Sequence, residues 1–411
     1  MKLNDIVKHA YSTVEYYRNI FDKNGITPDM INNECDLSLL PVLKKETIRD
    51  NPYSLISNNY DIENLCKEYT SGTSGDSLIV YKSHDDQVRA NYSMAKFRLK
   101  EYGISPFDKV CYFYMFSRNN DNKLVIDSIL KNEKSLSLNI FTSELSTMEK
   151  YVRAINEFKP EYVLSIPSYL FIFAKYIKEN GFTINCNIKC VELKGEYILD
   201  SQIDLIREVF KAPVLNHYGT TETYGIAFSC QNGNLHILKD NVIVEILDEN
   251  LQPVKDGKEG RVYVTSLSNK AMPLIRYEID DRAIYQNDTQ CECNNRGKCI
   301  KILSGRVTEY ITLTNKQKIN SGKIYYAIEK VNYKYSKIIK HFREIQYDIN
   351  LFDIHLVLAK DYSDKRLIEN VFVSALRDYK LDLAVWRFHY CDYINHNYKK
   401  HQYFINLYKG E

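Results

Sequence analysis

The sequence predicts an α/β protein with a large, multi-layer N-terminal domain that contains a β-rich region, followed by a small α+β domain. Apolar runs typical of buried strands alternate with amphipathic helical patterns between residues 110 and 219. From about residue 235, short strands separated by turns replace this alternation, and after residue 307 a shorter α+β pattern follows. We therefore expect two domains, residues 1–306 and 307–411.

The first expected elements are helices over residues 4–22 and 84–101. Between them, residues 63–69 and 77–83 are expected to form two strands around a short loop, since the second segment is rich in β-branched and aromatic residues. The alternating part continues with strands and helices in turn. The strands are expected at 110–116, 162–166, 188–195 and 212–219, and the helices at 147–158, 169–181 and 201–210. The short strands that follow are NLHILKD, VIVEILDEN, GRVYVTSL and PLIRYEI.

Composition excludes several classes of protein. The 55 basic and 53 acidic residues leave a formal net charge of +2, which gives no global field for nucleic acid or an anionic membrane. The C-terminal segment 389–404 interleaves basic and aromatic residues, but this charge and the lack of a known module argue against nucleic-acid binding. The start is amphipathic, without the apolar core of a signal peptide, and no run is long enough for a membrane span. We expect a cytoplasmic protein whose ten cysteines are reduced.

The stretch YTSGTSG at 69–75 concentrates glycine and hydroxyl residues between the two early strands. A flexible linker has this composition, but a glycine-rich loop that leaves a strand also lets backbone N–H groups approach an anion. It is not a P-loop of the GxxxxGK[ST] type, because Asp76 follows Gly75. The candidate phosphate ligands are Ser71, Gly72, Thr73, Ser74 and Gly75.

Four short motifs follow one another along the chain. They are YTSGTSG at 69–75, HYGTTET at 217–223, MPLIRYEIDDRA at 272–283 and SGR at 304–306. In this order they resemble the adenylate-forming superfamily of acyl-CoA synthetases, and most closely its branch of phenylacetate-CoA ligases, CapK-like proteins and coenzyme F390 synthetase. The segments LPVLKKETIRDN at 40–51 and IPSYL at 166–170 strengthen the resemblance, which spans nearly the whole chain. It implies a large adenylation domain and a small, mobile C-terminal domain.

The resemblance also implies a role for each motif residue. Residues 71–75 would enclose the β- and γ-phosphates of ATP, and Tyr218, with Gly219 and Thr220, would lie near the adenine. Thr221 would contact the α-phosphate and Glu222 would hold Mg²⁺. The ribose contacts and the mobile catalytic cation would come from later in the chain. Asp281 would contact the ribose, and Arg306 would add a further ribose contact or a hinge contact at the domain junction. Lys400, or alternatively Lys399, would be the cation, from aligning Phe404 and Ile405 with a motif like SGKxxxF(I/V).

Two positions depart from the pattern of these relatives. Asp76 stands where lysine is frequent, which removes a positive charge near the leaving pyrophosphate unless another base such as Lys82 compensates. Asp280 stands where glycine is frequent, which changes the backbone freedom beside Asp281. The simpler alternatives are that Glu222 and Asp281 are ordinary solvated acids. Arg276 and Tyr277 would then belong to an exposed strand.

A second constellation consists of thiols and one imidazole in the turn-rich region. Cys230, His236, Cys291 and Cys293 offer four ligands for a tetrahedral Zn²⁺ if their two segments are adjacent in space. Cys299 is a substitute ligand. The alternative is that these are ordinary reduced cysteines. A closed shell of four ligands predicts a structural metal.

The reaction implied by the resemblance is the ATP- and Mg²⁺-dependent activation of a small carboxylic acid as an acyl-adenylate, with release of pyrophosphate. The second step would transfer the acyl group to coenzyme A. Alternative acceptors are an amine, a hydroxyl or a carrier protein, and an ATP-binding scaffold without catalysis is a further alternative. The sequence identifies neither the acid nor the oligomeric state, and a homodimer is compatible with it.

Overall fold

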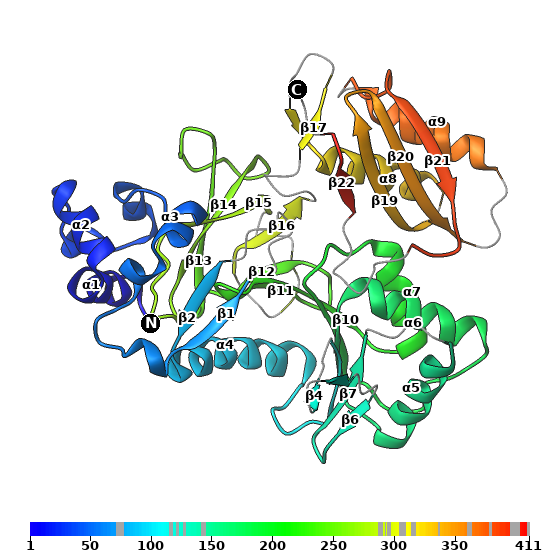
Figure 1. Cartoon of the computed structure of the whole chain (residues 1–411), viewed down its shortest axis with the longest axis horizontal. Helices are drawn as coiled ribbons and strands as arrows, with labels where there is room; N and C mark the ends of the chain where they lie inside the picture. The colour runs from blue at the N-terminus through cyan, green and yellow to red at the C-terminus, as the bar shows by residue number, and fades with distance from the viewer. Residues whose placement is uncertain are drawn as a thin grey trace. The chain divides into compact units, whose positions relative to one another are not determined.

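The computed structural model describes most of the chain, which divides into two compact units (Figure 1). The first comprises Met1–Ser105 and Asn216–Ile302, and the second Pro106–Leu215 and Leu303–Glu411. The expected domain boundary at residues 306 and 307 lies outside the described residues. None of the described helices combines the length and apolar character of a membrane-spanning segment. The described residues are 1–70, 78–114, 118–120, 123–125, 129–140, 145–286, 291, 293, 297–303, 310–313, 318–335, 338–359, 364–377, 380–394 and 403–408.

The first unit begins with two helices where one was expected. These are α1 (Leu3–Thr13) and α2 (Glu15–Lys23), separated by Val14. Val14 is extended, with φ −121° and ψ 119°, and its side chain is fully buried. This break gives the second helix its own direction, so that Tyr17 and Phe21 reach the same apolar core as the buried face of α1. Hydrophobic spacing alone does not reveal such a break.

Short helices and a hairpin connect this pair to the long helix α4 (His84–Tyr102). The hairpin consists of β1 (Cys66–Tyr69) and β2 (Ile79–Lys82), which are antiparallel, with Tyr69 opposite Ile79. This confirms the two expected strands around the glycine-rich loop. Ser83 caps α4 by accepting a hydrogen bond from the backbone N–H of Asp86. The short helices are η1 (Pro28–Met30), η2 (Glu34–Leu39), α3 (Lys45–Asp50), η3 (Pro52–Leu55) and η4 (Ile62–Asn64).

The β-rich region of the first unit is a sheet of short strands in the order β13, β14, β15, β16, β12, β11, β10. The expected strand PLIRYEI starts later than its pattern suggests, at Tyr277. Pro273 has no N–H to donate, and Arg276 has a positive φ of 52°. The strands are β10 (Val214–Thr220), β11 (Tyr224–Ser229), β12 (Leu235–Ile237), β13 (Val242–Leu247), β14 (Glu259–Ser266), β15 (Tyr277–Gln286) and β16 (Cys299–Leu303).

The second unit contains the alternating strands and helices expected from residue 110 onward. Its strands lie in the order β9, β8, β3, β7, β6; the first four are parallel and β6 is antiparallel to β7. The strands are β3 (Val110–Tyr114), β6 (Ile129–Lys131), β7 (Ser135–Asn139), β8 (Tyr162–Ser165) and β9 (Cys190–Lys194), with a separate pair β4 (Arg118–Asn120) and β5 (Lys123–Val125). The helices are α5 (Leu145–Phe158), α6 (Pro167–Glu179) and α7 (Asp200–Phe210).

The end of the chain forms a separate α+β sheet in the order β21, β20, β19, β22. Figure 1 shows α8 and α9 on one face of this sheet. Phe342, Phe352 and Phe372 pack in the core between them. The elements are β17 (Tyr310–Thr312), β18 (Lys318–Asn320), α8 (Gly322–Lys334), β19 (Ile339–Asp348), β20 (Leu351–Leu358), α9 (Lys365–Ala375), β21 (Val385–Tyr390) and β22 (Phe404–Asn406).

Candidate functional site

The HYGTTET motif forms the end of β10 and the turn into β11. The pairing register of the two strands shifts between Tyr218 and Gly219, which marks a bulge. A Cβ atom at Gly219 would lie 2.2 Å from the backbone oxygen of Tyr224, so only glycine fits there. The turn residues Thr220, Thr221 and Glu222 are thereby held in a fixed local geometry.

Tyr218 and Asp281 meet although they are 63 residues apart in sequence. The phenol of Tyr218 donates a hydrogen bond to Oδ2 of Asp281 at 2.7 Å. Both side chains are only partly buried, Tyr218 on β10 and Asp281 on β15. The structure therefore brings the aromatic residue of one motif and the carboxylate of another to one place.

Glu222 and Tyr277 form a second, buried contact between the same two motifs. Glu222 is 6% exposed, and its Oε1 accepts a hydrogen bond of 2.8 Å from the phenol of Tyr277. Burial, and next the carboxylate of Glu222, raise the pKa of Tyr277, so the phenol stays a proton donor. The interpretation of Glu222 as a solvated acid is therefore wrong.

Arg276 is also buried, which contradicts the interpretation of residues 276 and 277 as an exposed strand. Its side chain is 2% exposed and its guanidinium forms an ion pair with Glu245, with Nη2 3.0 Å from Oε1. It also donates to the backbone oxygen of Leu40. The backbone of Leu43 bonds on both sides of Tyr277, accepting from Glu278 at 2.9 Å and donating to Arg276 at 3.0 Å. The LPVLKK segment thus packs on the start of β15.

Asp280 occupies the backbone conformation that glycine adopts most easily. Its φ is 63°, in the left-handed region, where an L side chain is strained but Asp is among the better-tolerated residues. Lys45 of α3 lies against it, with Nζ 2.6 Å from Oδ2 of Asp280. This ion pair offsets the strain beside Asp281, so the departure from glycine has a local compensation.

Lys82 at the end of β2 lies among protein groups of the same unit. Its side chain is 1% exposed, and Nζ donates to the backbone oxygen of Thr221 at 2.5 Å and to Oε2 of Glu68 at 2.8 Å. Nζ also lies 3.4 Å from the centre of the Tyr224 ring. These contacts occupy the ammonium group, so the expectation that Lys82 replaces the missing charge at position 76 is not supported.

Glu68 completes this network on the neighbouring strand β1. One carboxylate oxygen accepts from Lys82, and the other accepts from the phenol of Tyr224 and from Nε2 of Gln87 at 3.1 Å. Burial alone would raise the pKa of Glu68, but Lys82 and the hydrogen bonds outweigh burial and hold that pKa below its ordinary value. The network therefore ties the hairpin around the glycine-rich loop to the Thr221 turn.

Comparisons with known proteins agree with this arrangement of motifs. Residues 61–269 match the model of the AMP-binding enzyme family. The chain belongs to this family. The phenylacetate-coenzyme A ligase of Escherichia coli K12 is 26% identical over 289 residues, which are 68% of this chain and 64% of that relative, less than two thirds of its length. The CapK protein of Staphylococcus aureus is 22% identical over 90% of this chain and 80% of its own.

Similarity to solved structures of other proteins shows the fold of this family member. A 2-hydroxyisobutyryl-CoA ligase in its postadenylation state matches with a TM-score of 0.75 at 16% identity, covering 98% of this chain and 88% of that one. The expected α/β fold class and the resemblance to the phenylacetate-CoA ligase and CapK-like branch are confirmed.

Several predicted site residues of this family member lie outside the described part of the chain. They are Ser71, Gly72, Thr73, Ser74 and Gly75, Arg306, and the two lysines Lys399 and Lys400. Their flanks are described. Strands β1 and β2 border the glycine-rich loop, and Phe404 and Ile405 lie in β22 opposite Glu344 and Ile345 of β19.

The four predicted zinc ligands come together in the first unit. Nε2 of His236 lies 3.1 Å from Sγ of Cys293 and 3.4 Å from Sγ of Cys291, which is 3.6 Å from Sγ of Cys230. All four ligand atoms lie within 4.8 Å of one another. Cys299 lies closest to the other ring nitrogen, with Sγ 3.4 Å from Nδ1. This position suits the role of a partner that orients the imidazole, and it suits the role of a substitute metal ligand less well.

Glu68, Tyr224 and Asn241 are structural members of the site that the sequence did not reveal. The buried Asn241 donates from Nδ2 to the backbone oxygens of Thr223 and Gly225, at 3.0 and 2.7 Å, and so holds the turn after β10. No motif marks these residues, because their partners lie far away in sequence. The only sequence feature that points to these residues is Gly225, which follows Tyr224. A glycine beside a motif permits close packing and so indicates a crowded turn.

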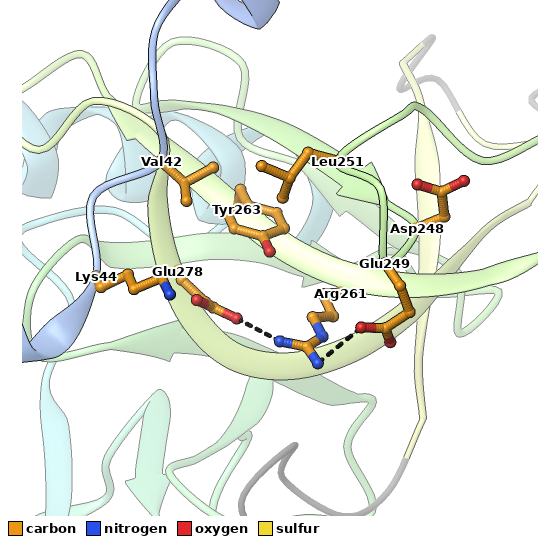
Figure 2. Close-up of a pocket in the computed structure, with 8 residues that line it drawn as sticks. All are labelled: Val42, Lys44, Asp248, Glu249, Leu251, Arg261, Tyr263 and Glu278. Atoms are coloured by element: carbon orange, nitrogen blue, oxygen red, sulfur yellow. Dashed lines mark hydrogen bonds and ion pairs between the residues drawn. The ribbon is translucent and has the colours of Figure 1, made fainter.

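A small cavity in the first unit is a different feature. Figure 2 shows Arg261 in it between two carboxylates, 2.8 Å from Glu249 and 3.1 Å from Glu278. Its volume of about 210 Å³ is below that of typical ligand pockets, its charged centre is already paired, and no predicted site residue lines it. It is therefore not the candidate site. The lining residues are Val42, Lys44, Asp248, Glu249, Leu251, Arg261, Tyr263 and Glu278.

Proposed function

We propose that this chain is an adenylate-forming ligase that activates a small carboxylic acid with ATP. A carboxylate oxygen of the acid attacks the α-phosphorus, the bond from that phosphorus to pyrophosphate breaks, and an acyl-adenylate forms. The observation that carries the proposal is the convergence of the HYGTTET motif, which lies inside the match to the AMP-binding family, with the segment 272–283 that follows this match. It is seen in the hydrogen bonds Tyr218–Asp281 and Glu222–Tyr277. Independent surface acids would not be joined in this way.

Different described residues would bind different parts of the nucleotide. Asp281 would accept hydrogen bonds from the ribose hydroxyls, and the phenol of Tyr218 would orient that carboxylate beside the adenine. Thr221, whose backbone oxygen is held by Lys82, would contact the α-phosphate. Gly219 and Thr220 would complete this wall of the nucleotide site.

Glu222 is the residue that would hold Mg²⁺. A carboxylate is the ligand type that Mg²⁺ prefers, and the Tyr277 phenol fixes one of its oxygens in a buried position. When bound, the ion would neutralise charge on the phosphates. Residues 71–75 would bind the β- and γ-phosphates, Arg306 would add a ribose contact, and Lys400, or Lys399, would stabilise the transition state from a domain formed by residues 307–411.

Coenzyme A is the acceptor we propose for the second step. Support comes from the relatives in Escherichia coli and Thermus thermophilus, which are phenylacetate-coenzyme A ligases. An amine or hydroxyl acceptor is the second candidate. It is favoured by the indoleacetate–lysine synthetase of Pseudomonas savastanoi, which is 24% identical over 220 residues.

Exchange of labelled pyrophosphate into ATP tests the first step without knowledge of the acceptor. The protein is incubated with Mg²⁺, ATP and a panel of aryl, fatty and amino acids, and Asp281→Ala is measured in parallel. We expect exchange with at least one acid, and weaker use of ATP by the variant, by about 1.5 to 3 kcal/mol for lost hydrogen bonds to a charged acceptor. ATP binding without exchange for any acid would favour the non-catalytic scaffold, and an unchanged ATP dependence in the variant would refute the role of Asp281.

A further inference from the structure

A second group of metal-binding side chains lies in the C-terminal sheet, apart from the thiol cluster. Asp353 and His355 are two residues apart on β20, so their side chains share one face of the sheet. His389 on the parallel edge strand β21 is directly opposite His355. One ligand atom from each of these three residues lies within 4.8 Å of the other two.

The three side chains lie on the face of the sheet opposite the apolar core. Phe352, Ile354 and Leu356 alternate with them along β20 and are fully buried in that core. The side chain of Asp353 is 8% exposed and that of His389 is 44% exposed. The group is therefore open to solvent on the side of β21, which gives an ion a path of entry.

The contacts among the three residues fit a metal site. Nε2 of His389 lies 3.1 Å from Oδ2 of Asp353, and the rings of His355 and His389 are stacked at 4.6 Å. Nε of Arg387 bonds to the other oxygen, Oδ1, and so orients the carboxylate with Oδ2 toward the imidazoles. Charged or polar groups that hold a ligating carboxylate in this way are a regular feature of metal sites.

The positive charges of Arg343 and Arg387 oppose a cation nearby, so we expect a weaker site than the thiolate cluster.

We infer that Asp353, His355 and His389 bind a divalent transition metal ion, with Zn²⁺ as the best match to two imidazoles and one carboxylate. Three protein ligands leave one position of a tetrahedral shell for water or an external ligand. The ion would join the exposed edge strand β21 to β20, since its ligands come from both strands. This inference does not depend on the proposed ligase activity.

Trp386 provides a local readout, because it is the one tryptophan of the chain and lies in β21. Its ring stacks on Phe352 at 4.6 Å, in the core beneath the three ligands. A metal that binds the folded state alone stabilises it by mass action. We therefore expect Zn²⁺ to raise the midpoint of thermal unfolding followed by Trp386 fluorescence.

The experiment titrates the full-length protein with Zn²⁺ by calorimetry and repeats the unfolding measurement on His355→Ala, His389→Gln and Asp353→Asn. We expect one site beyond the thiol cluster, weakened by at least about 10-fold in each variant, with loss of the Trp386 shift. His84→Ala, which removes an exposed histidine of α4 outside the group, is the matched control and should bind as the parent does.

Co²⁺ separates the two sites by their ligands. Thiolate coordination gives an intense near-ultraviolet charge-transfer band, whereas imidazole and carboxylate ligands give weak visible bands. The second equivalent of Co²⁺ should add visible bands that disappear in His389→Gln, a variant at an exposed position whose fold can be checked by circular dichroism. Absence of a second equivalent, or equal binding in the parent and all three variants, would overturn the inference.

Discussion

At the scale of single residues, Asp280, one of the two positions that depart from related sequences, is compensated by a neighbour from elsewhere in the chain. Asp280 adopts a left-handed backbone conformation with φ 63°, and Lys45 pairs with it at 2.6 Å. Sequence reasoning recognised that a glycine was missing beside Asp281, but it had no means of identifying Lys45 as its partner. The cost of the conformation and the benefit of the ion pair can be measured separately.

Asp280→Gly and Asp280→Ala both remove the Lys45 ion pair, but only glycine also relieves the backbone strain. We expect Asp280→Ala to unfold more easily than Asp280→Gly by about 1 kcal/mol, the cost of a left-handed conformation for a residue with a Cβ. Urea denaturation followed by circular dichroism compares the two variants. Equal midpoints would show that the backbone at this position is not strained in solution.

Tyr277→Phe tests the contact that holds Glu222. Loss of the phenol leaves one oxygen of a buried carboxylate without its donor, and we expect a loss of about 1 to 3 kcal/mol in stability. The Mg²⁺ concentration needed for pyrophosphate exchange should also change. Tyr285→Phe on the same strand is the control, since its phenol donates to the backbone oxygen of Val244 at 2.8 Å. A shift in Mg²⁺ dependence in both variants, or in neither, would refute the specific role of Tyr277.

At the scale of elements, the structure joins segments that the sequence presents as separate motifs. The hairpin β1–β2 borders the glycine-rich loop, and the Lys82–Glu68 pair connects it to the turn between β10 and β11. The thiol cluster of three cysteines and His236 likewise brings β12 close to the segment that follows β15. Each connection consists of a few polar side chains, so substitutions can remove it while the strands and helices stay in place.

Removal of Lys82 should be more harmful than removal of the whole pair. Lys82→Met leaves Glu68 largely buried without its cation, and we expect a loss of about 2 to 4 kcal/mol. The double variant Lys82→Met, Glu68→Gln should recover part of this loss, because no unpaired charge remains. Additive losses in the double-mutant cycle would show that the two side chains do not interact.

Glu68 also predicts a dependence of stability on pH. Its pKa is lower in the folded protein than its ordinary value of 4.5, so its contribution is complete above that value and is lost as the pH falls through the lowered pKa. Glu68→Gln should remove this part of the acid sensitivity. The test measures the unfolding midpoints of the parent and of Glu68→Gln at pH 7 and below pH 4.5. Equal changes of the midpoint with pH in both proteins would contradict the prediction.

The thiol cluster predicts about one tightly held zinc per chain, as expected of a single four-ligand site. Elemental analysis of purified protein measures it, and Cys291→Ser should lower both the zinc content and the thermal midpoint. Cys35→Ser is the control, since Cys35 is exposed and outside the cluster. Metal-free protein with unchanged stability in Cys291→Ser would show that these are ordinary reduced cysteines.

At the scale of the whole molecule, the proposed reaction has two steps that the two parts of the chain would serve differently. The predicted nucleotide-binding residues Tyr218, Glu222 and Asp281 belong to the first unit. The candidate lysines precede β22, where Phe404 is buried and pairs with β19 of the C-terminal sheet. A variant of the late lysine should therefore affect one step and spare the other.

Lys400→Ala should cut adenylation by on the order of 10²-fold or more, the scale for loss of one preorganised electrostatic partner in a transition state. Transfer from a supplied acyl-adenylate should remain nearly intact, because a mobile domain would present different residues in that step. Lys399→Ala is the matched control. Equal loss of both steps would indicate a structural tail, and a loss confined to Lys399→Ala would move the role to that residue.

The sequence by itself determined the fold class, the order of most elements and the motif residues, because hydrophobic periodicity and short motifs are local properties of the chain. It also identified the four residues of the thiol cluster, because a Cys, a His and a CxC pair are residue types typical of metal ligands. Only the tertiary structure decided which partners those residues have. Lys45 at Asp280, Glu68 at Lys82 and His389 at Asp353 are contacts between distant segments. Such contacts depend on how strands pair and helices pack, which no local pattern records.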